Sequence, residues 1–333
     1  YKGTFGENWN LHTGVSYGLG LNKIGINSNQ VKNDENAIHL KMKVGKKITE
    51  RIKITAGADY FVTDFDEEFT EFEGQSFNVG YQNSIAAAYA ESDIFFSKKL
   101  AMKIGARASQ NSLLDEFRLS PRASFAYKVS KNGQFSFAYG DFVQTPRADY
   151  IKYSNDFESE KASHYILNFQ HNKDGRLFRA EAYYKKYDDL VKFDTNIAQF
   201  NSVFTNEGSG FAKGLDIFWR DNKTFKNTEY WVSYSYIDTE RDYLNFPNQV
   251  TPSFVADHTL SIVTKHWIED WKSQIGFTYI VNSGRPYNNP NELEFMNGKT
   301  KAFQNLSFNW AYLLSQQKIL YFSVSNIIGT DNV

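Results

Sequence analysis

The sequence predicts an all-β protein, an antiparallel up-and-down transmembrane β-barrel, and three observations lead to this prediction. Apolar and polar residues alternate with a period of two along most of the 333 residues, which is the pattern of strands with two chemically different faces. The alternating segments, about fifteen in number, run mostly about 10–14 residues, longer than ordinary globular strands and long enough to cross a bilayer. Short turns and long connections also follow one another in strict order along the chain, as they do in transmembrane barrels.

Residues 38–44 show the alternation most simply. They read Ile-His-Leu-Lys-Met-Lys-Val, so apolar side chains occupy the even positions and His or Lys the odd ones. The same alternation marks residues 9–19, 52–62, 230–236, 275–281 and 306–314. It explains how a chain with 17% aromatic residues can have a mean hydropathy of only −0.53.

The connections between these segments sort into two kinds. Short turns are expected at residues 49–50, 97–99, 130–133, 171–175, 221–227, 269–270 and 315–318. Longer connections are expected at residues 21–36, 64–76, 111–118, 145–160, 189–208, 240–255 and 282–301. Five of the six prolines fall in the longer connections and Pro121 falls at a strand start, which keeps proline out of strand interiors.

Composition excludes several classes of protein. The absence of Cys excludes disulfide scaffolds and Cys-ligated metal sites. A net charge of −1 gives no electrostatic case for nucleic acid as a partner. The longest apolar run, residues 85–90, is far too short for a transmembrane helix. The six His residues form no metal-binding or catalytic spacing, so the sequence predicts no catalytic residues, no cofactor and no enzyme.

Two of the longer connections contain candidate ligand contacts. Residues 64–73 hold six carboxylates and no basic residue, so Asp64, Asp66 and Glu68 are candidates for binding Ca²⁺ or a polar ligand. The favoured alternative is a solvated acidic loop. Residues 283–290 offer Arg285, Tyr287 and Asn288, which suit sugar recognition but equally suit a turn-rich loop. Arg147 and Tyr150 are further outer-loop candidates.

The polar parity predicts which side chains line the inside of the barrel. Strand positions opposite the apolar face would meet the interior and any solute that passes through it. These lumen-facing candidates are Lys41, Lys43, Arg51, Lys53, Asp59, Arg107, Arg179 and Glu181.

Several local motifs, in order, resemble the barrel of TonB-dependent outer-membrane receptors. Residues 120–133 begin Ser-Pro-Arg-Ala-Ser-Phe and end in a tight turn, and residues 137–146 end in Thr-Pro. Residues 206–216 carry the glycine-rich sequence Asn-Glu-Gly-Ser-Gly-Phe-Ala-Lys-Gly-Leu-Asp. Similar matches lie at residues 160–169, 182–191, 233–236 and 322–329. Each motif is weak alone, and the ordered set over about residues 100–330 carries the resemblance.

The resemblance implies a receptor of the cell outer membrane that imports an iron chelate, a vitamin or an oligosaccharide. It implies a 22-stranded barrel closed by a plug, of which residues 1–333 would be one partial barrel domain truncated at both ends, without the plug. The implied partners are a TonB-type energy-coupling protein, reached through an N-terminal part absent here, membrane lipid or lipopolysaccharide, and a surface lipoprotein.

Two rival interpretations stay open. The first is a passive outer-membrane channel or structural barrel protein with the same wall. The second is a soluble all-β carbohydrate-binding protein, whose aromatic residues would pack inward instead of outward.

Overall fold

The computed structural model describes residues 1–71 and 74–332 and is almost entirely β. Sixteen strands form one antiparallel sheet in which each strand pairs with its neighbours in the chain. The strands are β1 Lys2–Phe5, β2 Trp9–Ile26, β3 Asn29–Thr49, β4 Ile52–Thr70, β5 Ser76–Phe95, β6 Leu100–Asn111, β7 Glu116–Lys128, β8 Gly133–Gln144, β9 Glu160–Lys173, β10 Arg176–Phe193, β11 Phe204–Asp221, β12 Thr228–Asp242, β13 His258–Ile268, β14 Ser273–Asn282, β17 Phe303–Ser315 and β18 Lys318–Val324. The predicted antiparallel up-and-down arrangement is confirmed.

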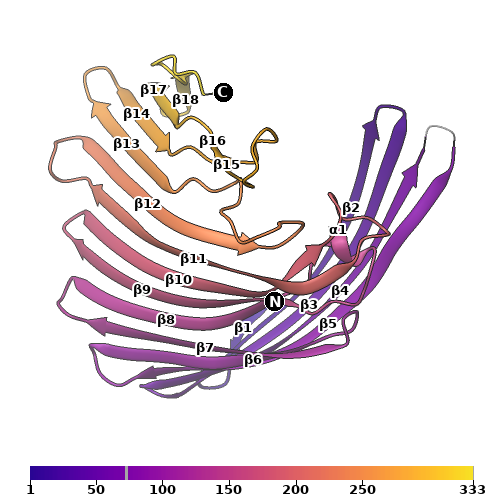
Figure 1. The fold of residues 1–333 in the computed structure, drawn as a ribbon. Helices are drawn as coiled ribbons and strands as arrows, with labels where there is room; N and C mark the ends of the chain where they lie inside the picture. Colours follow the sequence, from indigo (N-terminus) through magenta and orange to yellow (C-terminus); the bar gives the residue numbers. More distant parts are fainter. Residues whose placement is uncertain (72–73, 333) are drawn as a thin grey trace.

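The sheet bends into the curved wall of a barrel (Figure 1). Apart from the hairpin of β2 and β3, short turns gather at one end of the strands and longer connections at the other (Figure 1). The longer connections carry a one-turn helix, α1 Ala148–Ile151, and a two-stranded ribbon of β15 Pro286–Tyr287 and β16 Gly298–Lys299. In the described part of the chain no helix is long and apolar enough to cross a membrane.

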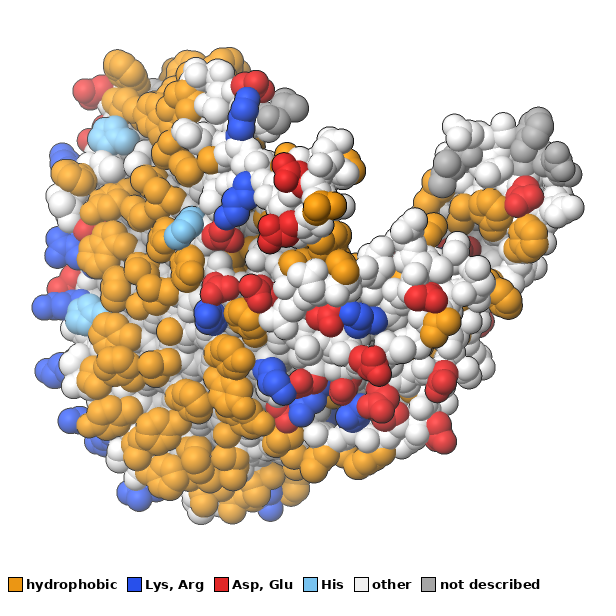
Figure 2. All heavy atoms as spheres, viewed as in Figure 1, with side chains coloured by type: hydrophobic (Ala, Val, Ile, Leu, Met, Phe, Trp, Pro, Cys, Tyr) orange, Lys and Arg blue, Asp and Glu red, His pale blue; other side chains and the backbone are white. Residues whose placement is uncertain are grey.

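Strand parity separates two faces, because paired residues on neighbouring strands point to the same side. The outer face is apolar and carries side chains such as Val15, Leu40, Phe137 and Leu167, all well exposed. Figure 2 shows such side chains gathered over the outer surface of the curved sheet. Aromatic rings also run across neighbouring strands there, as in the Tyr139–Tyr165 pair with ring centroids 5.1 Å apart.

The strands are longer at the long-connection end than the sequence predicts. The expected long connection at residues 21–36 is wrong: β2 and β3 form a hairpin there, with only Asn27 and Ser28 between them. Likewise, residues 64–70 belong to β4. Alternation ends in these segments because both faces of a strand that projects beyond an apolar layer can be polar, although its backbone stays paired.

Pro121 lies inside β7, not at a strand start as the sequence predicts. It pairs with Ala106 of β6. Pairing of β7 with β8, however, begins only at Arg122, opposite Gly140. Proline has no N–H group to donate to the strand on its other side. The hydrogen-bonded pairing of β7 with β8 therefore stops at Arg122 and does not include Pro121.

Asp221 ties two short turns together at the opposite end. Its side chain is 2% exposed and accepts hydrogen bonds from the backbone N–H groups of Lys223 (2.7 Å) and Thr224 (2.9 Å) and from the Thr224 hydroxyl (2.5 Å). Arg176 Nε, from the neighbouring hairpin, donates at 3.1 Å. A buried carboxylate with this many donors fixes the geometry of the turn.

We expect Asp221→Asn to lower the thermal unfolding midpoint by a few degrees, because the amide accepts weaker hydrogen bonds and loses the charge facing Arg176. Circular dichroism at 218 nm would follow the transition. Asp174→Asn is the matched control, since Asp174 has a positive φ of 49° that Asn tolerates. Equal midpoints for the two variants would contradict this role for Asp221.

Candidate functional site

The inner face of the wall carries charged side chains that neutralise one another across strands. Asp59 on β4 receives a hydrogen bond from Arg107 Nη1 on β6 at 2.6 Å, and His39 Nε2 on β3 lies 3.2 Å from its other oxygen. Lys103 on β6 lies 3.3 Å from both Glu91 and Asp93 on β5. These contacts join residues far apart in the sequence, because every second position of each strand faces the same side.

Glycine keeps this inner face open. A Cβ on Gly57 would lie 2.5 Å from the ring of Tyr89, so Tyr89 can lie flat over the wall only because residue 57 has no side chain. Beside it is a hollow of about 440 Å³. Its lining holds five cationic and three acidic side chains: Lys43, Lys53, Lys103, Arg107, Arg122, Asp59, Glu91 and Asp93. The wall therefore presents a polar surface with a cationic excess.

The connection between β8 and β9, residues 145–159, folds inward over this wall. Lys152, just after α1, forms an ion pair with Glu67 of β4 at 2.7 Å, although the two residues are 85 positions apart. Both side chains are largely buried, 10% and 14% exposed. Residues 145–159 thus reach back across the inner face to β4 instead of projecting outward (Figure 1).

A hydrophobic cluster holds these residues in place. Tyr150, Ile151 and Phe157 are buried together with Val191 of β10. Tyr150 packs against Phe193 with ring centroids 5.9 Å apart. Partly buried neighbours come from several strands and connections: Tyr81, Leu113, Leu114, Phe193, Ala198, Phe204 and Leu244. The cluster is the main buried core of a sheet that has no second layer.

Polar contacts extend the cluster into a continuous rim. Arg118 of β7 forms ion pairs with Glu116 and, at 2.9 Å, with Glu158. Asn206 of β11 donates to the Glu158 carbonyl at 3.1 Å. Asn245 donates a hydrogen bond to the Asn196 carbonyl at 3.1 Å. This contact joins the connection between β10 and β11 to the connection between β12 and β13. Phe246 and Phe295 meet edge to face at 4.9 Å, so residues 283–302 also belong to this rim.

The structure separates the predicted outer-loop residues. Arg147 precedes α1, is exposed and pairs with Asp149 at 2.6 Å. Tyr150 is buried in the cluster, 8% exposed, so its side chain holds the loop rather than facing the outside. Arg285, Tyr287 and Asn288 lie in another connection, where Tyr287 is 44% exposed and packs over Gly298. Among the described residues no hydrogen bond or ion pair joins the two groups.

Most of the predicted lumen-facing residues share the inner face with Asp59. Lys43, Lys53, Asp59 and Arg107 line the hollow described above. Lys41 packs over Gly14 of the neighbouring strand. On β10, Glu181 accepts a hydrogen bond from Asn168 at 3.1 Å and Arg179 is exposed. Arg51 differs from these, because it lies in the turn between β3 and β4.

Residues 64–70 of the predicted acidic loop belong to a strand in the structure, and residues 72–73 lie outside the described part of the chain. Asp64, Asp66 and Glu68 lie on β4 opposite Asn36, Asp34 and Lys32 of β3. Lys32 in turn lies 3.4 Å from Asp34. Within the part of the chain that the structure describes, no three His, Cys, Asp or Glu side chains converge as metal ligands would.

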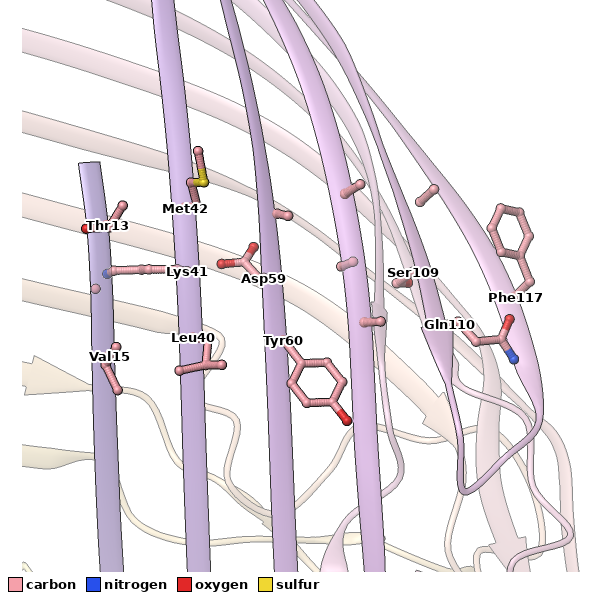
Figure 3. Close-up of a pocket in the computed structure, with 16 residues that line it drawn as sticks. Thr13, Val15, Leu40, Lys41, Met42, Asp59, Tyr60, Ser109, Gln110 and Phe117 are labelled. Atoms are coloured by element: carbon pink, nitrogen blue, oxygen red, sulfur yellow. The ribbon is translucent and has the colours of Figure 1, made fainter. Parts of the chain in front are cut away.

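A second hollow, of about 620 Å³, lies on the apolar outer face. Short side chains of three neighbouring strands form its floor: Ala58, Ala86, Ala88 and Ala108. Figure 3 shows the larger side chains around it, among them Leu40, Tyr60 and Phe117.

The residues that sequence reasoning missed act through distant contacts. Lys152, Glu67 and Glu158 hold the inward-folded connection. Glu67 stands in the acidic run of residues 64–73, but nothing local in the sequence pairs it with Lys152. In the sequence, the glycine-rich segment at residues 206–216 was a signal of close packing between strands. Its glycines leave room for side chains of the adjacent strands.

Comparison with known proteins gives a consistent result. A family model described as "TonB dependent receptor-like, beta-barrel" matches residues 1–327. The chain is similar in structure to the ferripyoverdine receptor of the outer membrane of Pseudomonas aeruginosa (TM-score 0.79, 10% identity, 97% of this chain and 50% of that chain). It is also similar to the ferric yersiniabactin uptake receptor FyuA from Yersinia pestis (TM-score 0.77, 13% identity, 98% and 55%).

A third similar structure is that of the FpvAI–pyocin S2 complex (TM-score 0.78, 9% identity, 98% and 52%). The chain therefore spans about half the length of these solved chains. No curated protein sequence matches it significantly.

Alkaline titration tests the buried cluster. Burial raises the pKa of Tyr150 and of Tyr243 above the ordinary value of 10.0. The folded state therefore holds these protons more tightly than the unfolded state, so this contribution to stability is complete below pH 10 and is lost as the pH rises through the raised values. We expect absorbance at 295 nm to show one fewer late-ionising tyrosine in Tyr150→Phe than in the wild-type protein. An unchanged number of late-ionising tyrosines in folded Tyr150→Phe would contradict the assignment.

Proposed function

The chain belongs to the family of TonB-dependent receptor-like β-barrels, and from this premise we propose that it forms part of the wall of an outer-membrane receptor that imports a bulky nutrient. The proposed nutrient is an iron chelate, a vitamin or an oligosaccharide. The observation that carries the proposal is the family match over residues 1–327, on a sheet with an apolar outer face and a charged inner face.

The wall is proposed to act without chemistry on the solute. The rim of residues 145–159, 194–203, 243–257 and 283–302 would meet the solute outside, and the charged inner face would guide it and contact a plug. The cationic excess in the inner hollow suits acidic groups on either of them. The apolar outer face would contact lipid chains and lipopolysaccharide, with acyl chains filling the outer hollow.

Further strands are proposed to complete the barrel. Strands β1 and β18 are the two ends of the sheet and have no other strand partner within residues 1–71 and 74–332. Unpaired strand edges are not stable in lipid. We propose a 22-stranded wall around a plug, coupled to a TonB-type protein by a segment outside this chain, with a surface lipoprotein as a partner over the rim.

Iron chelates have support among the solved structures, two of which are receptors for ferripyoverdine and ferric yersiniabactin by their own descriptions. The identities of 10% and 13% support the shared fold. The rival function, a passive channel with the same wall, predicts a different response to energy supply, which the second experiment below measures.

A pair of substitutions on β9 tests which face meets lipid. We expect Leu167→Arg to cost about 2–4 kcal/mol if it lies near the bilayer midplane and to reduce the heat-modifiable, assembled fraction on gels. Asn168→Arg, one residue along, should assemble normally because it faces the inside and Glu181. Equal assembly of both variants, or a full-length protein found in the soluble fraction, would overturn the membrane assignment.

Uptake measurements test the energised import. We expect a strain that lacks the full-length protein to lose uptake of one solute class from a panel of ferric chelates, cobalamin and oligosaccharides. The same uptake should stop when the TonB-type protein is deleted or a protonophore is added. Uptake that is unaffected by both treatments and proportional to the external concentration would show a passive channel instead.

A further inference from the structure

Arg241 occupies an unusual place on the inner face at the long-connection end. It lies on β12 opposite Gly210 of β11, which in turn lies opposite Tyr187 of β10. A Cβ on Gly210 would lie 3.0 Å from Arg241 Cγ and 2.6 Å from the Glu240 carbonyl oxygen. The arginine side chain therefore lies flat across the glycine and reaches the tyrosine two strands away.

Aromatic rings surround the guanidinium group. Its Cζ atom lies 4.6 Å from the ring centroid of Tyr187, 5.5 Å from that of Phe254 and 5.6 Å from that of Tyr243. The backbone of Arg241 is fixed by two hydrogen bonds with Val250, at 2.9 and 3.1 Å. Such an arrangement orients a cation in advance of any ligand.

The guanidinium has no anionic partner within the described residues. Its Nε is buried and makes no hydrogen bond there. The carboxylates nearby are engaged elsewhere: Asp242 pairs with Lys192, Glu240 accepts from Gln249 at 3.0 Å, and Glu160 accepts the Val191 N–H at 3.2 Å. Glu160 lies within electrostatic range of this group, without an ion pair to Arg241.

Other arginines of the wall show what a structural arginine looks like in this protein. Arg107 pairs with Asp59, Arg118 with Glu116 and Arg176 with Asp221. Arg107 thus joins two strands, Arg118 also pairs with Glu158 of the β8–β9 connection, and Arg176 steadies a turn. Arg241 makes none of these contacts, although buried donors are nearly always satisfied in folded proteins, and it has five donors to offer.

We propose that Arg241, with Tyr187, Tyr243 and Phe254, is a recognition site for a carboxylate attached to a flat, apolar group on the imported solute. The planar guanidinium can bind a carboxylate through two parallel hydrogen bonds, and the rings would pack against the flat group beside it. Phe254 is 56% exposed, so a solute can reach the site from the rim. The proposal rests on the proposed function and names one chemical group that the receptor recognises.

The test uses the full-length protein in detergent and 4-(trifluoromethyl)benzoate as the probe, followed by ¹⁹F NMR. We expect saturable binding of the benzoate, little binding of neutral 4-(trifluoromethyl)benzyl alcohol, and at least tenfold weaker benzoate binding by Arg241→Gln. Arg241→Lys should fall between, because an ammonium keeps the charge but loses the two-pronged geometry. Phe254→Leu, at an exposed ring, should weaken binding without disturbing the fold.

Arg220→Gln is the matched control, since Arg220 is an exposed arginine at the short-turn end of β11, where it pairs with Glu229. It should bind the benzoate like the wild type. Heat-modifiable mobility on gels confirms that each variant has folded. Absence of benzoate binding by the wild type, equal binding of the neutral alcohol, or unchanged binding by folded Arg241→Gln would overturn the proposal.

The outcome is separable from that of the uptake experiment. Energised uptake with benzoate binding that does not depend on Arg241 would overturn only this site. Binding that depends on Arg241, together with uptake that does not need the TonB-type protein, would support the site and overturn the proposed energised import.

Discussion

Backbone pairing between neighbours in the chain holds the strands in register, and the faces, the hollows and the rim all depend on it. Because the register of β3, β4, β5 and β6 is continuous up to a shift between Lys47 and Thr49, odd-numbered residues on these strands face inward up to that shift. One slip of a single residue would place charged side chains such as Asp59 on the apolar outer face. The ion pairs across strands and the exposed apolar side chains are therefore two consequences of the same ladder.

Glycine residues on the inner face determine how much space the neighbouring side chains leave inside the wall. Where a strand carries glycine on the inner face, the neighbouring side chain lies down over it, as Tyr89 does over Gly57 and Arg241 over Gly210. A flat wall leaves space for a solute or a plug, whereas upright rings would fill it. This gives a physical reason for the glycines of residues 206–216, which stand in the segment that resembles the family's strand entry.

The rim is built on a different principle from the wall. Its stability comes from a hydrophobic cluster and from ion pairs between connections, with Lys152–Glu67 and Arg118–Glu158 fixing the two sides of residues 145–159. Pairing between β7 and β8 ends at Arg122 and Gly140, next to Pro121. The connection after β8 therefore starts where these two strands no longer pair. The wall thus provides a scaffold, and the rim is a separately packed layer where solute recognition is proposed to occur.

The sequence by itself determined the antiparallel up-and-down fold, the two faces, most of the turns and the family, because these follow from local alternation and from motifs that repeat in order. It could not show that β2 and β3 continue through residues 21–36, because the alternation of apolar and polar residues is lost where both faces of a strand are exposed to water. It made Tyr150 a candidate ligand contact in an outer loop, but it could not show that packing against Phe193 and Val191 buries this side chain. Only the tertiary structure decided these points and showed that the Arg241 guanidinium has no anionic partner among the residues described. Each point depends on contacts between residues on different strands and connections, and alternation carries no record of which distant side chains meet.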